Sequence, residues 1–212
     1  MKLNPMLPDV GISRKENSER TRESLVDAGI ELFTTHGFAA VSTVQICERL
    51  GVTRGALYHH FNNKTDLMEA CFSRVDHRLV ARLAALEATG PTDQLRATCR
   101  EFVDQLGDPV VRQILFVEAP AALGWARWRE LDGGRSLELV RNQLAAVADA
   151  GLLGTHDPRV LAHLLLGALN ELAMFVAASS STDRATVLAR QELELLLNDL
   201  LSSTGTASDD GD

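Results

Sequence analysis

The sequence predicts an all-α protein, and three observations support that fold class. Of the 212 residues, 45% are apolar, which is enough for a real hydrophobic core. Long apolar stretches recur at helical spacing, and no alternating β-branched run stands out among them. Only six prolines are present. We therefore expect a chain of helices joined by short breaks.

The two ends of the chain lie outside this helical pattern. Residues 1–17 mix Pro, Lys, Asn, Ser and Gly without periodicity, and residues 202–212 are polar and acidic. Both compositions predict disordered segments, an arm at the start and a tail at the end. Between them, the first helix should span residues 18–36, because apolar residues recur on one face and Gly37 follows as a terminator.

Residues 42–67 have the residue pattern of a helix-turn-helix. Ser42 precedes an apolar helical run, and Gln45 follows three residues later, which is the capping-box spacing. Gly51 should end this helix, because a residue without Cβ readily forms a left-handed turn. Thr53 can then cap the next helix. Two short helices joined by a turn that contains glycine predict a helix-turn-helix.

The second of these helices presents side chains that suit DNA. Arg54, Tyr58 and His59 can reach phosphates and base edges. Lys64 begins the following helix after a capping Asn63, although a lysine is unfavourable at the positive end of a helix dipole. Because the chain has only three lysines, we favour contact with a DNA phosphate over an ordinary exposed lysine.

Charge is distributed unevenly along the chain. Residues 1–74 hold nine Lys and Arg and nine Asp and Glu, whereas the remainder holds 12 basic and 20 acidic residues and so the whole net charge of −8. A neutral N-terminal region can still bind DNA if its basic side chains lie on one face. The acidic remainder would then be held away from the phosphates.

These N-terminal patterns match a known family. The match covers roughly the first third of the chain and includes Leu25, Ala28, Leu32, Phe33, Gly37, Phe38, Ser42, Ile46, Gly51, Val52, Thr53, Gly55, Leu57, Tyr58, His60, Phe61, Lys64 and Leu67. In these residues the chain resembles the TetR family of bacterial transcriptional regulators. It departs from the family at Cys47 and Leu50, where alanine is usual; both are conservative changes in a small core.

The resemblance implies a three-helix DNA-binding domain over residues 18–69. Residues 70–201 would form a larger helical domain that binds an effector and forms a homodimer through its last two helices. By position, Arg54, Gly55 and His59 would lie nearest the base edges, and Gly55 would let the helix approach the groove closely. The side chains that would hold phosphates are Ser42, Thr43, Thr53, Tyr58 and Lys64.

An apolar run over residues 111–128 is the first candidate for lining an effector site. It contains Phe116, and Pro120 should break or kink it. Trp125 and Trp128 fall close to one face, and each has two interpretations. Buried aromatic residues often anchor a core, but these two could also line a cavity or flank its mouth.

A second candidate is the predicted helix over residues 158–178, which is apolar nearly all round and should be buried on two sides. His163, Asn170 and Met174 share one stripe of it. The polar members either satisfy hydrogen bonds in the core or interface, or orient an otherwise apolar ligand. The last helix, residues 183–201, has a leucine-rich stripe that is compatible with dimerisation.

Several kinds of site are not expected. Cys47, Cys71 and Cys99 form no CxxC pair, so we expect neither a disulfide scaffold nor a zinc site. The sequence shows no motif for a cofactor or for a hydrolase. No signal peptide is visible, and polar residues in the helix over 158–178 argue against a membrane span, so we expect a cytoplasmic protein.

The leading hypothesis is a repressor that a hydrophobic or amphipathic ligand releases from a roughly palindromic operator. An architectural DNA-binding protein without an effector is one alternative, and a helical-bundle enzyme is another. The sequence leaves open the effector, the operator and the sign of regulation.

Overall fold

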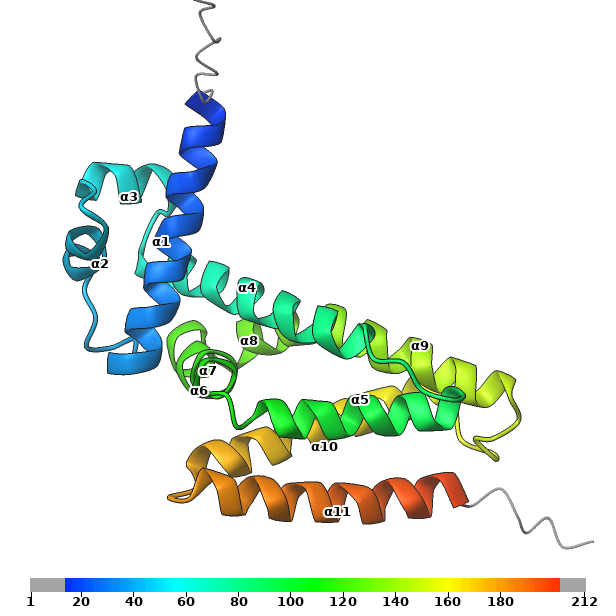
Figure 1. The fold of residues 1–212 in the computed structure, drawn as a ribbon. Helices are drawn as coiled ribbons and strands as arrows, with labels where there is room; N and C mark the ends of the chain where they lie inside the picture. The colour runs from blue at the N-terminus through cyan, green and yellow to red at the C-terminus, as the bar shows by residue number, and fades with distance from the viewer. Residues whose placement is uncertain (1–13, 203–212) are drawn as a thin grey trace, which may run out of the picture.

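The computed structural model describes residues 14–202, which are helical and contain no strand (Figure 1). This confirms the predicted all-α class. The first three helices form a head, and α4 leads from the head into a layered body of the remaining helices (Figure 1). The elements are α1 (Arg14–His36), α2 (Thr43–Leu50), α3 (Arg54–His60), α4 (Lys64–Ala84), α5 (Pro91–Gln105), α6 (Pro109–Val111), the π-helix η1 (Arg112–Glu118), α7 (Ala119–Leu123), α8 (Trp125–Asp132), α9 (Arg135–Asp149), α10 (Pro158–Ala178) and α11 (Thr182–Ser202).

The first helix is longer than predicted. It begins at Arg14 rather than at Ser18, so residues 14–17 of the predicted arm are helical. Arg, Lys and Glu are good helix formers, and this exposed first turn needs no apolar face. The apolar pattern therefore predicted only the part of α1 that packs against other helices. The rest of the predicted arm, and residues 203–212 of the predicted tail, lie outside the described residues.

Head and body share one hydrophobic core. Buried apolar side chains form a single cluster that extends from Leu25 in α1 through Phe72 in α4 to Leu197 in α11. The seam between α1 and α4 is tight at Gly29, where a Cβ would lie 2.9 Å from the sulfur of Cys71. A displacement of the head must therefore disturb packing along α4.

Of the two predicted effects of Pro120, a break or a kink, the structure excludes the break. The helical run continues past it and ends at Gly124, which has φ 78°. The preceding π-helix explains this, because its wider turns relieve the clash between a proline ring and the preceding carbonyl. A proline cannot donate to the carbonyl five residues earlier, that of Leu115. The indole nitrogen of Trp128 donates to that carbonyl instead, at 2.8 Å.

The helix α10 occupies the predicted range and packs against α9, η1 and α11. Its length and a mean hydropathy of 1.8 would allow it to cross a membrane, but 44% of its most apolar segment is buried within the fold. Such values are also typical of the core helix of a soluble protein. One face of α10 therefore packs in the core, through its contacts with these three neighbours.

Candidate DNA interface and effector cavity

The two short helices of the head are fixed by their predicted caps. Gln45 N donates to Ser42 Oγ at 3.2 Å, and Ser42 N donates to Gln45 Oε1 at 2.7 Å, which completes a capping box. The Ser42 hydroxyl also donates to Gln45 Oε1, at 2.9 Å. Its hydrogen is therefore already used within the head. Thr53 Oγ1 accepts from Ala56 N at 3.1 Å, which leaves its hydroxyl hydrogen available to a phosphate.

The exposed face of α3 has the composition predicted for DNA contact. Arg54, Gly55, Tyr58 and His59 are exposed, whereas Leu57 between them is buried. An alanine Cβ at position 55 would meet nothing closer than Thr53 Oγ1, at 3.7 Å. The fold therefore does not require glycine there, and the close approach of Gly55 to DNA stays a prediction.

A polar surface joins α2 to α3. The hydroxyls of Thr43 and Tyr58 lie 3.4 Å apart, and the Arg54 guanidinium lies 5.9 Å from the centre of the Tyr58 ring. The hydrogen bond with Thr43 and the nearby Arg54 lower the pKa of Tyr58. We call this surface the DNA-facing surface; it comprises Thr43, Thr53, Arg54, Gly55, Tyr58 and His59.

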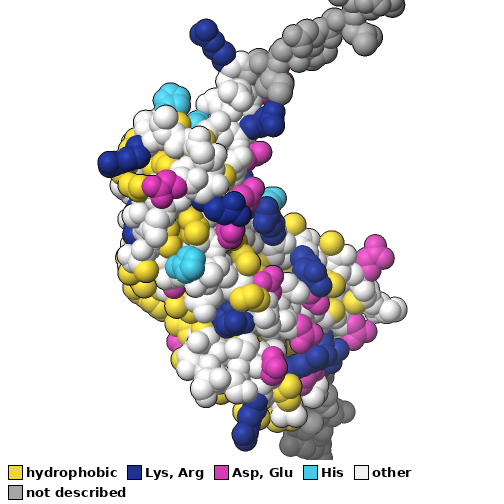
Figure 2. Space-filling model, turned by 60° about the vertical axis from the view of Figure 1, so that its left-hand side comes forward, with side chains coloured by type: hydrophobic (Ala, Val, Ile, Leu, Met, Phe, Trp, Pro, Cys, Tyr) yellow, Lys and Arg dark blue, Asp and Glu magenta, His cyan; other side chains and the backbone are white. Residues whose placement is uncertain are grey.

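Basic side chains on this side of the head are separated from one another, and acidic side chains lie among them (Figure 2). Arg49, for example, pairs with Glu31 at 3.1 Å. This arrangement agrees with the balanced charge of residues 1–74. Attraction to DNA would therefore depend on a few positions rather than on a broad basic patch.

Lys64 has hydrogen-bond partners inside the head, and its contact with a DNA phosphate stays a prediction. Its ammonium donates to the carbonyls of Phe38 and Val41, at 2.7 and 2.8 Å, and lies 4.1 Å from the centre of the Phe38 ring. These contacts hold the loop between α1 and α2 against the start of α4. The helix dipole correctly marked Lys64 as unusual, and these two backbone carbonyls give the lysine a structural role that the sequence did not predict.

His60, the last residue of α3, does not belong to the DNA-facing surface. It is half-buried beside the ring of Phe61, at 6.4 Å between centroids. Burial, and then the neighbouring His59 and Arg22, lower the pKa of His60. The imidazole is therefore neutral at pH 7 and does not add charge to the DNA-facing surface.

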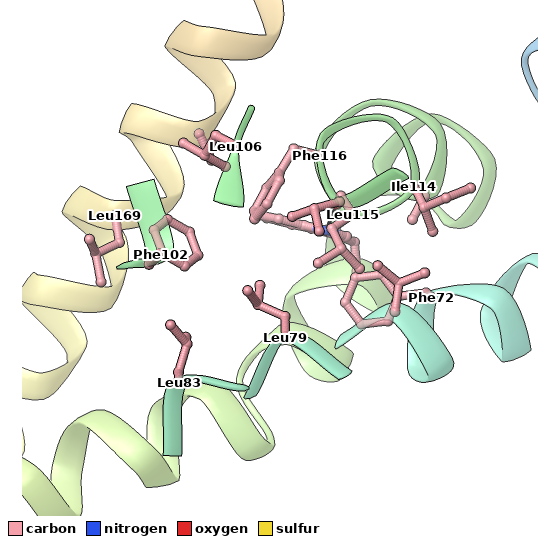
Figure 3. Close-up of a cluster of buried hydrophobic side chains, with 14 of the residues drawn as sticks. Phe72, Leu79, Leu83, Phe102, Leu106, Ile114, Leu115, Phe116 and Leu169 are labelled. Atoms are coloured by element: carbon pink, nitrogen blue, oxygen red, sulfur yellow. Dashed lines mark hydrogen bonds between the residues drawn. The ribbon is translucent and has the colours of Figure 1, made fainter. Parts of the chain in front are cut away.

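A nearly closed cavity lies in the body, between α4, α5, η1, α8, α9 and α10. Labelled apolar side chains from α4, α5, η1 and α10 lie around it (Figure 3). Its volume is about 20 Å³, which admits a water molecule or two but not a larger ligand. We call it the effector cavity; its lining comprises Phe72, Asp76, Leu79, Leu83, Thr98, Phe102, Leu115, Phe116, Asp132, Ser136, Leu139, Val140, Leu166, Leu169 and Asn170.

Two of the predicted ligand-binding residues, Phe116 and Asn170, line this cavity. The two tryptophans do not. Trp128 is fully buried as a core anchor, and Trp125 is 59% exposed. Of the two interpretations of Trp128, core anchor or cavity lining, the structure supports the core anchor.

His163 and Met174 also lie outside the cavity lining, and His163 is exposed. Their stripe on α10 runs along the border of the buried face rather than through its middle. Of the three residues, Asn170 is buried, and Asp132 of α8 accepts a hydrogen bond from its amide at 2.6 Å. Helical spacing correctly placed the three residues on one stripe. Of these, Asn170 lines the cavity and is hydrogen-bonded to Asp132 of α8.

Sequence reasoning missed two buried carboxylates in the cavity wall. Asp76 accepts from Arg135 at 2.8 Å and from Ser136 at 3.3 Å. Asp132 accepts from Arg129 at 3.0 Å, in addition to Asn170. Burial is the first cause of a raised pKa in both carboxyls, and the neighbouring arginine or amide partly offsets it.

A signal for Asp76 was present in the sequence. It occupies the apolar stripe of α4, between Phe72 and Leu79. A carboxylate inside an apolar stripe must be buried with a partner or mark a site. For Asp132, which precedes a pair of glycines, the sequence contains no comparable signal.

A third missed residue, Glu118, connects the cavity wall to the head. Its carboxylate Oε2 accepts from Phe38 N at 2.7 Å, and its Oε1 would lie 3.3 Å from a Cβ at Gly37. Glu118 is the last residue of η1, the same short π-helix that contributes Phe116 to the cavity. The loop held by Lys64 is thus also bound to the wall of the effector cavity.

The last two helices expose much apolar surface. Val160, Leu164 and Phe175 on α10 are 51–64% exposed. On α11 the large exposed apolar residues are Val187, Leu188, Leu195 and Leu196. Apolar area of this extent is typical of a protein–protein interface.

The three cysteines are buried and free. Burial raises the pKa of Cys99 to about 12 and that of Cys71 beyond the usual thiol range. Neither is a reactive thiolate at neutral pH. Among residues 14–202 no cluster of three or more His, Cys, Asp or Glu could hold a metal ion.

Comparison with known proteins identifies the family. Residues 92–200 match the family model described as "Tetracyclin repressor-like, C-terminal domain", and residues 25–71 match "Bacterial regulatory proteins, tetR family". This chain belongs to the TetR family. The family's DNA-binding members are transcriptional regulators, and we therefore describe the protein as a DNA-binding transcriptional regulator.

Individual relatives agree with this assignment. The transposon Tn10 TetC protein of Escherichia coli is 28% identical over 166 residues, which cover 76% of this chain and 82% of TetC. The regulator SrpR of Pseudomonas putida is 39% identical over 62 residues, 29% of either chain. A TetR-family regulator from Pectobacterium atrosepticum has a crystal structure that matches with a TM-score of 0.80 and 29% identity, covering 89% of this chain and 97% of that one.

Proposed function

We propose that this TetR-family regulator is a homodimeric repressor that a hydrophobic or amphipathic ligand releases from its operator. The observation that supports this most directly is the position of η1. Phe116 of η1 lines the effector cavity, and Glu118 of the same helix binds Phe38 in the head. A movement of the cavity wall is thereby connected to the position of the head.

Ligand binding would have to move that wall. The cavity volume of about 20 Å³ is far below the several hundred Å³ of typical ligand pockets. A ligand would therefore bind by displacing side chains such as Phe116. The π-helical turns of η1 suit such a displacement, because π segments within helices often occur at functional sites.

The proposed dimer forms through the exposed apolar faces of α10 and α11. It would place two DNA-facing surfaces on one duplex, with α3 of each head in a major groove. Two-fold symmetry then predicts a roughly palindromic operator with half-sites about one helical turn, roughly 34–36 Å, or a multiple of it apart. Because each head has no broad basic patch, strong binding would require both heads together.

Coupling between the sites would be reciprocal. A ligand that favours a different separation of the heads weakens operator binding, and the operator weakens ligand binding by the same factor. One relative of similar fold, FadR of Bacillus subtilis, is described in complex with stearoyl-CoA. Its TM-score of 0.67 at 19% identity relates the folds, and its ligand is consistent with a large apolar effector in such a body. We place the regulator in the cytoplasm, where an operator is accessible.

The decisive experiment is selection of bound sequences from a random DNA pool with the full-length protein. It should enrich a roughly palindromic site, and a reporter behind that site should be repressed when the protein is present. Lack of any enriched sequence, or enrichment by DNA shape alone, would favour an architectural protein. Activation of the reporter would reverse the proposed sign.

The connection through η1 is tested with Glu118→Gln. This substitution keeps the acceptor oxygen but removes the charge that strengthens its hydrogen bond to Phe38 N. Operator affinity should change while the fold is preserved, and Glu130→Gln, an exposed carboxylate on α8, provides the matched control. An operator affinity unaffected by both substitutions would argue against η1 as the connection.

A further inference from the structure

The polar groups of the effector cavity have a distinctive arrangement of charge. The side chains of Asp76 and Asp132 are 4% and 7% exposed, and both residues line the cavity. Their arginine partners are not part of the lining. Arg135 and Arg129 approach from the solvent side, with side chains 51% and 34% exposed. The cavity therefore faces two buried carboxylates while the compensating cations lie outside it.

Asn170 adds an acceptor atom, its side-chain oxygen, to which no group donates a hydrogen bond. It is 3% exposed, and its amide nitrogen donates to Asp132 Oδ2 at 2.6 Å. Its Oδ1 is buried and has no hydrogen-bond partner. The opposite amide orientation would bring Oδ1 against the Asp132 carboxylate, so that carboxylate fixes the orientation. Buried polar atoms are nearly always paired, and an exception indicates a missing partner.

The neighbouring hydroxyls do not supply that partner. Ser136 Oγ donates its hydrogen to Asp76. Thr98 Oγ1 accepts from the amide of Gln143 at 2.7 Å and keeps its own hydrogen, but Asn170 Oδ1 receives no hydrogen bond from it. Both recorded hydrogen bonds to Asp132 end on the same oxygen, Oδ2, which leaves Oδ1 open to a further donor. Asp132 and Asn170 thus each present an oxygen to which none of these hydrogen bonds is made.

We propose that the effector cavity recognises an amphiphilic cation, in which a protonated amine meets Asp132 and Asn170 while an apolar body packs among Phe72, Leu83 and Phe116. This inference rests on the proposed function, because it names the ligand class for the same cavity. A fatty carboxylate is disfavoured, because it would bring a third negative charge next to Asp76 and Asp132 in a medium of low dielectric constant.

Four eight-carbon probes test this ligand class by calorimetry with the full-length protein and no DNA. They are octylammonium, octyltrimethylammonium, octanol and octanoate, which share the apolar body. Octylammonium should bind at least about tenfold more tightly than octanol and octanoate, since charge-assisted hydrogen bonds are the strong ones. Octyltrimethylammonium has the charge but no N–H group, so it should bind more weakly than octylammonium.

Contrary results are clearly defined. Octanoate binding as tightly as octylammonium, or no binding of octylammonium at millimolar concentration, would overturn the proposal. Equal binding of the two cations would overturn the role of Asn170 as an acceptor.

Variants locate the site. Asp132→Asn keeps the shape of the side chain and removes its charge, so it should abolish the preference for octylammonium over octanol. Asp104→Asn, which removes an exposed carboxylate on α5 paired with Arg190, should leave that preference unchanged. If Asp132→Asn fails to fold, Asp76→Asn tests the same surplus of negative charge. A preference that persists in a folded variant of either residue would overturn the proposal.

Operator release is measured separately with the selected DNA site. If octylammonium binds but no probe releases the operator, the ligand class is supported and the proposed release mechanism fails. If octanoate releases the operator and octylammonium does not bind, the release mechanism is supported and the cationic class is wrong.

Discussion

The DNA-facing surface and the effector cavity are built in opposite ways. The DNA-facing surface comes from two adjacent helices, α2 and α3, and its side chains project into solvent from ends fixed by local caps. The effector cavity draws its wall from six elements between Phe72 and Asn170, and its polar groups are buried. A change in the first should affect binding alone, whereas a change in the second should affect stability as well.

The two surfaces also differ in whether they must change conformation before they can bind a partner. The DNA-facing surface is exposed before DNA arrives, so DNA need not reorganise the head. The effector cavity has a volume of about 20 Å³ and must expand before a ligand can enter. A rigid reading surface combined with a wall that must move is what a switch of this kind requires, since a ligand acts only through a difference between two states.

The largest effect should appear on the cavity side. Trp128→Ala removes a fully buried indole and its bond to the Leu115 carbonyl, so the free energy of unfolding should fall by about 3–5 kcal/mol. Trp125→Ala removes an exposed ring that stacks on Trp128, and should lower it by at most about 1.5 kcal/mol. Urea unfolding of both variants measures the difference, and similar losses would contradict the assignment of Trp128 as the anchor.

Lys64 decides whether the head has a structural cation of its own. Lys64→Ala removes the ammonium bonds to Phe38 and Val41, and should lower the free energy of unfolding by about 1.5–3 kcal/mol. Lys15→Ala, in the exposed first turn of α1, is the control and should have little effect. If Lys64→Ala instead leaves stability unchanged and reduces the salt dependence of DNA binding, the original phosphate prediction is right.

Arg54 provides a test of whether α3 recognises the base sequence of the operator. A bidentate contact to guanine would make Arg54→Ala weaken binding to the selected operator by about 1–3 kcal/mol, with a much smaller loss on random DNA. Its unfolding free energy should be unchanged, because the side chain is exposed. Arg49→Ala, on the neighbouring helix, controls for loss of positive charge. Equal losses on both DNAs would place Arg54 on a phosphate.

The smallest effect is a pH dependence from the cavity. The folded-state pKa of Asp132 is raised, so its contribution to stability is present below the unfolded pKa near 3.8 and is lost as pH rises through the folded pKa. Asp132→Asn lacks this dependence. The stability of the native protein relative to Asp132→Asn should therefore increase as pH is lowered from 7 toward 4. A difference that shrinks over that range would show that Arg129 outweighs burial.

Local chemistry explains which features were predictable. The caps Ser42 and Thr53, the left-handed Gly51 and the start of α10 at Pro158 depend on neighbours within a few residues, and the structure has each of them where the sequence predicts it. The exposure of Arg54, His59 and their neighbours follows from helical periodicity alone. These features belong to single helices and short turns, for which the sequence order is also the spatial order.

The remaining features depended on contacts between distant segments. Backbone carbonyls of the loop after α1 bind Lys64, η1 accommodates Pro120 with the help of Trp128, and α8 selects Asn170 from its stripe on α10. The sequence by itself thus determined the helix-turn-helix and the buried faces of the helices, because caps and apolar spacing act locally. Only the tertiary structure decided where the buried Asp76 and Asp132 and the half-buried Glu118 find their partners, because burial and pairing depend on which helices meet.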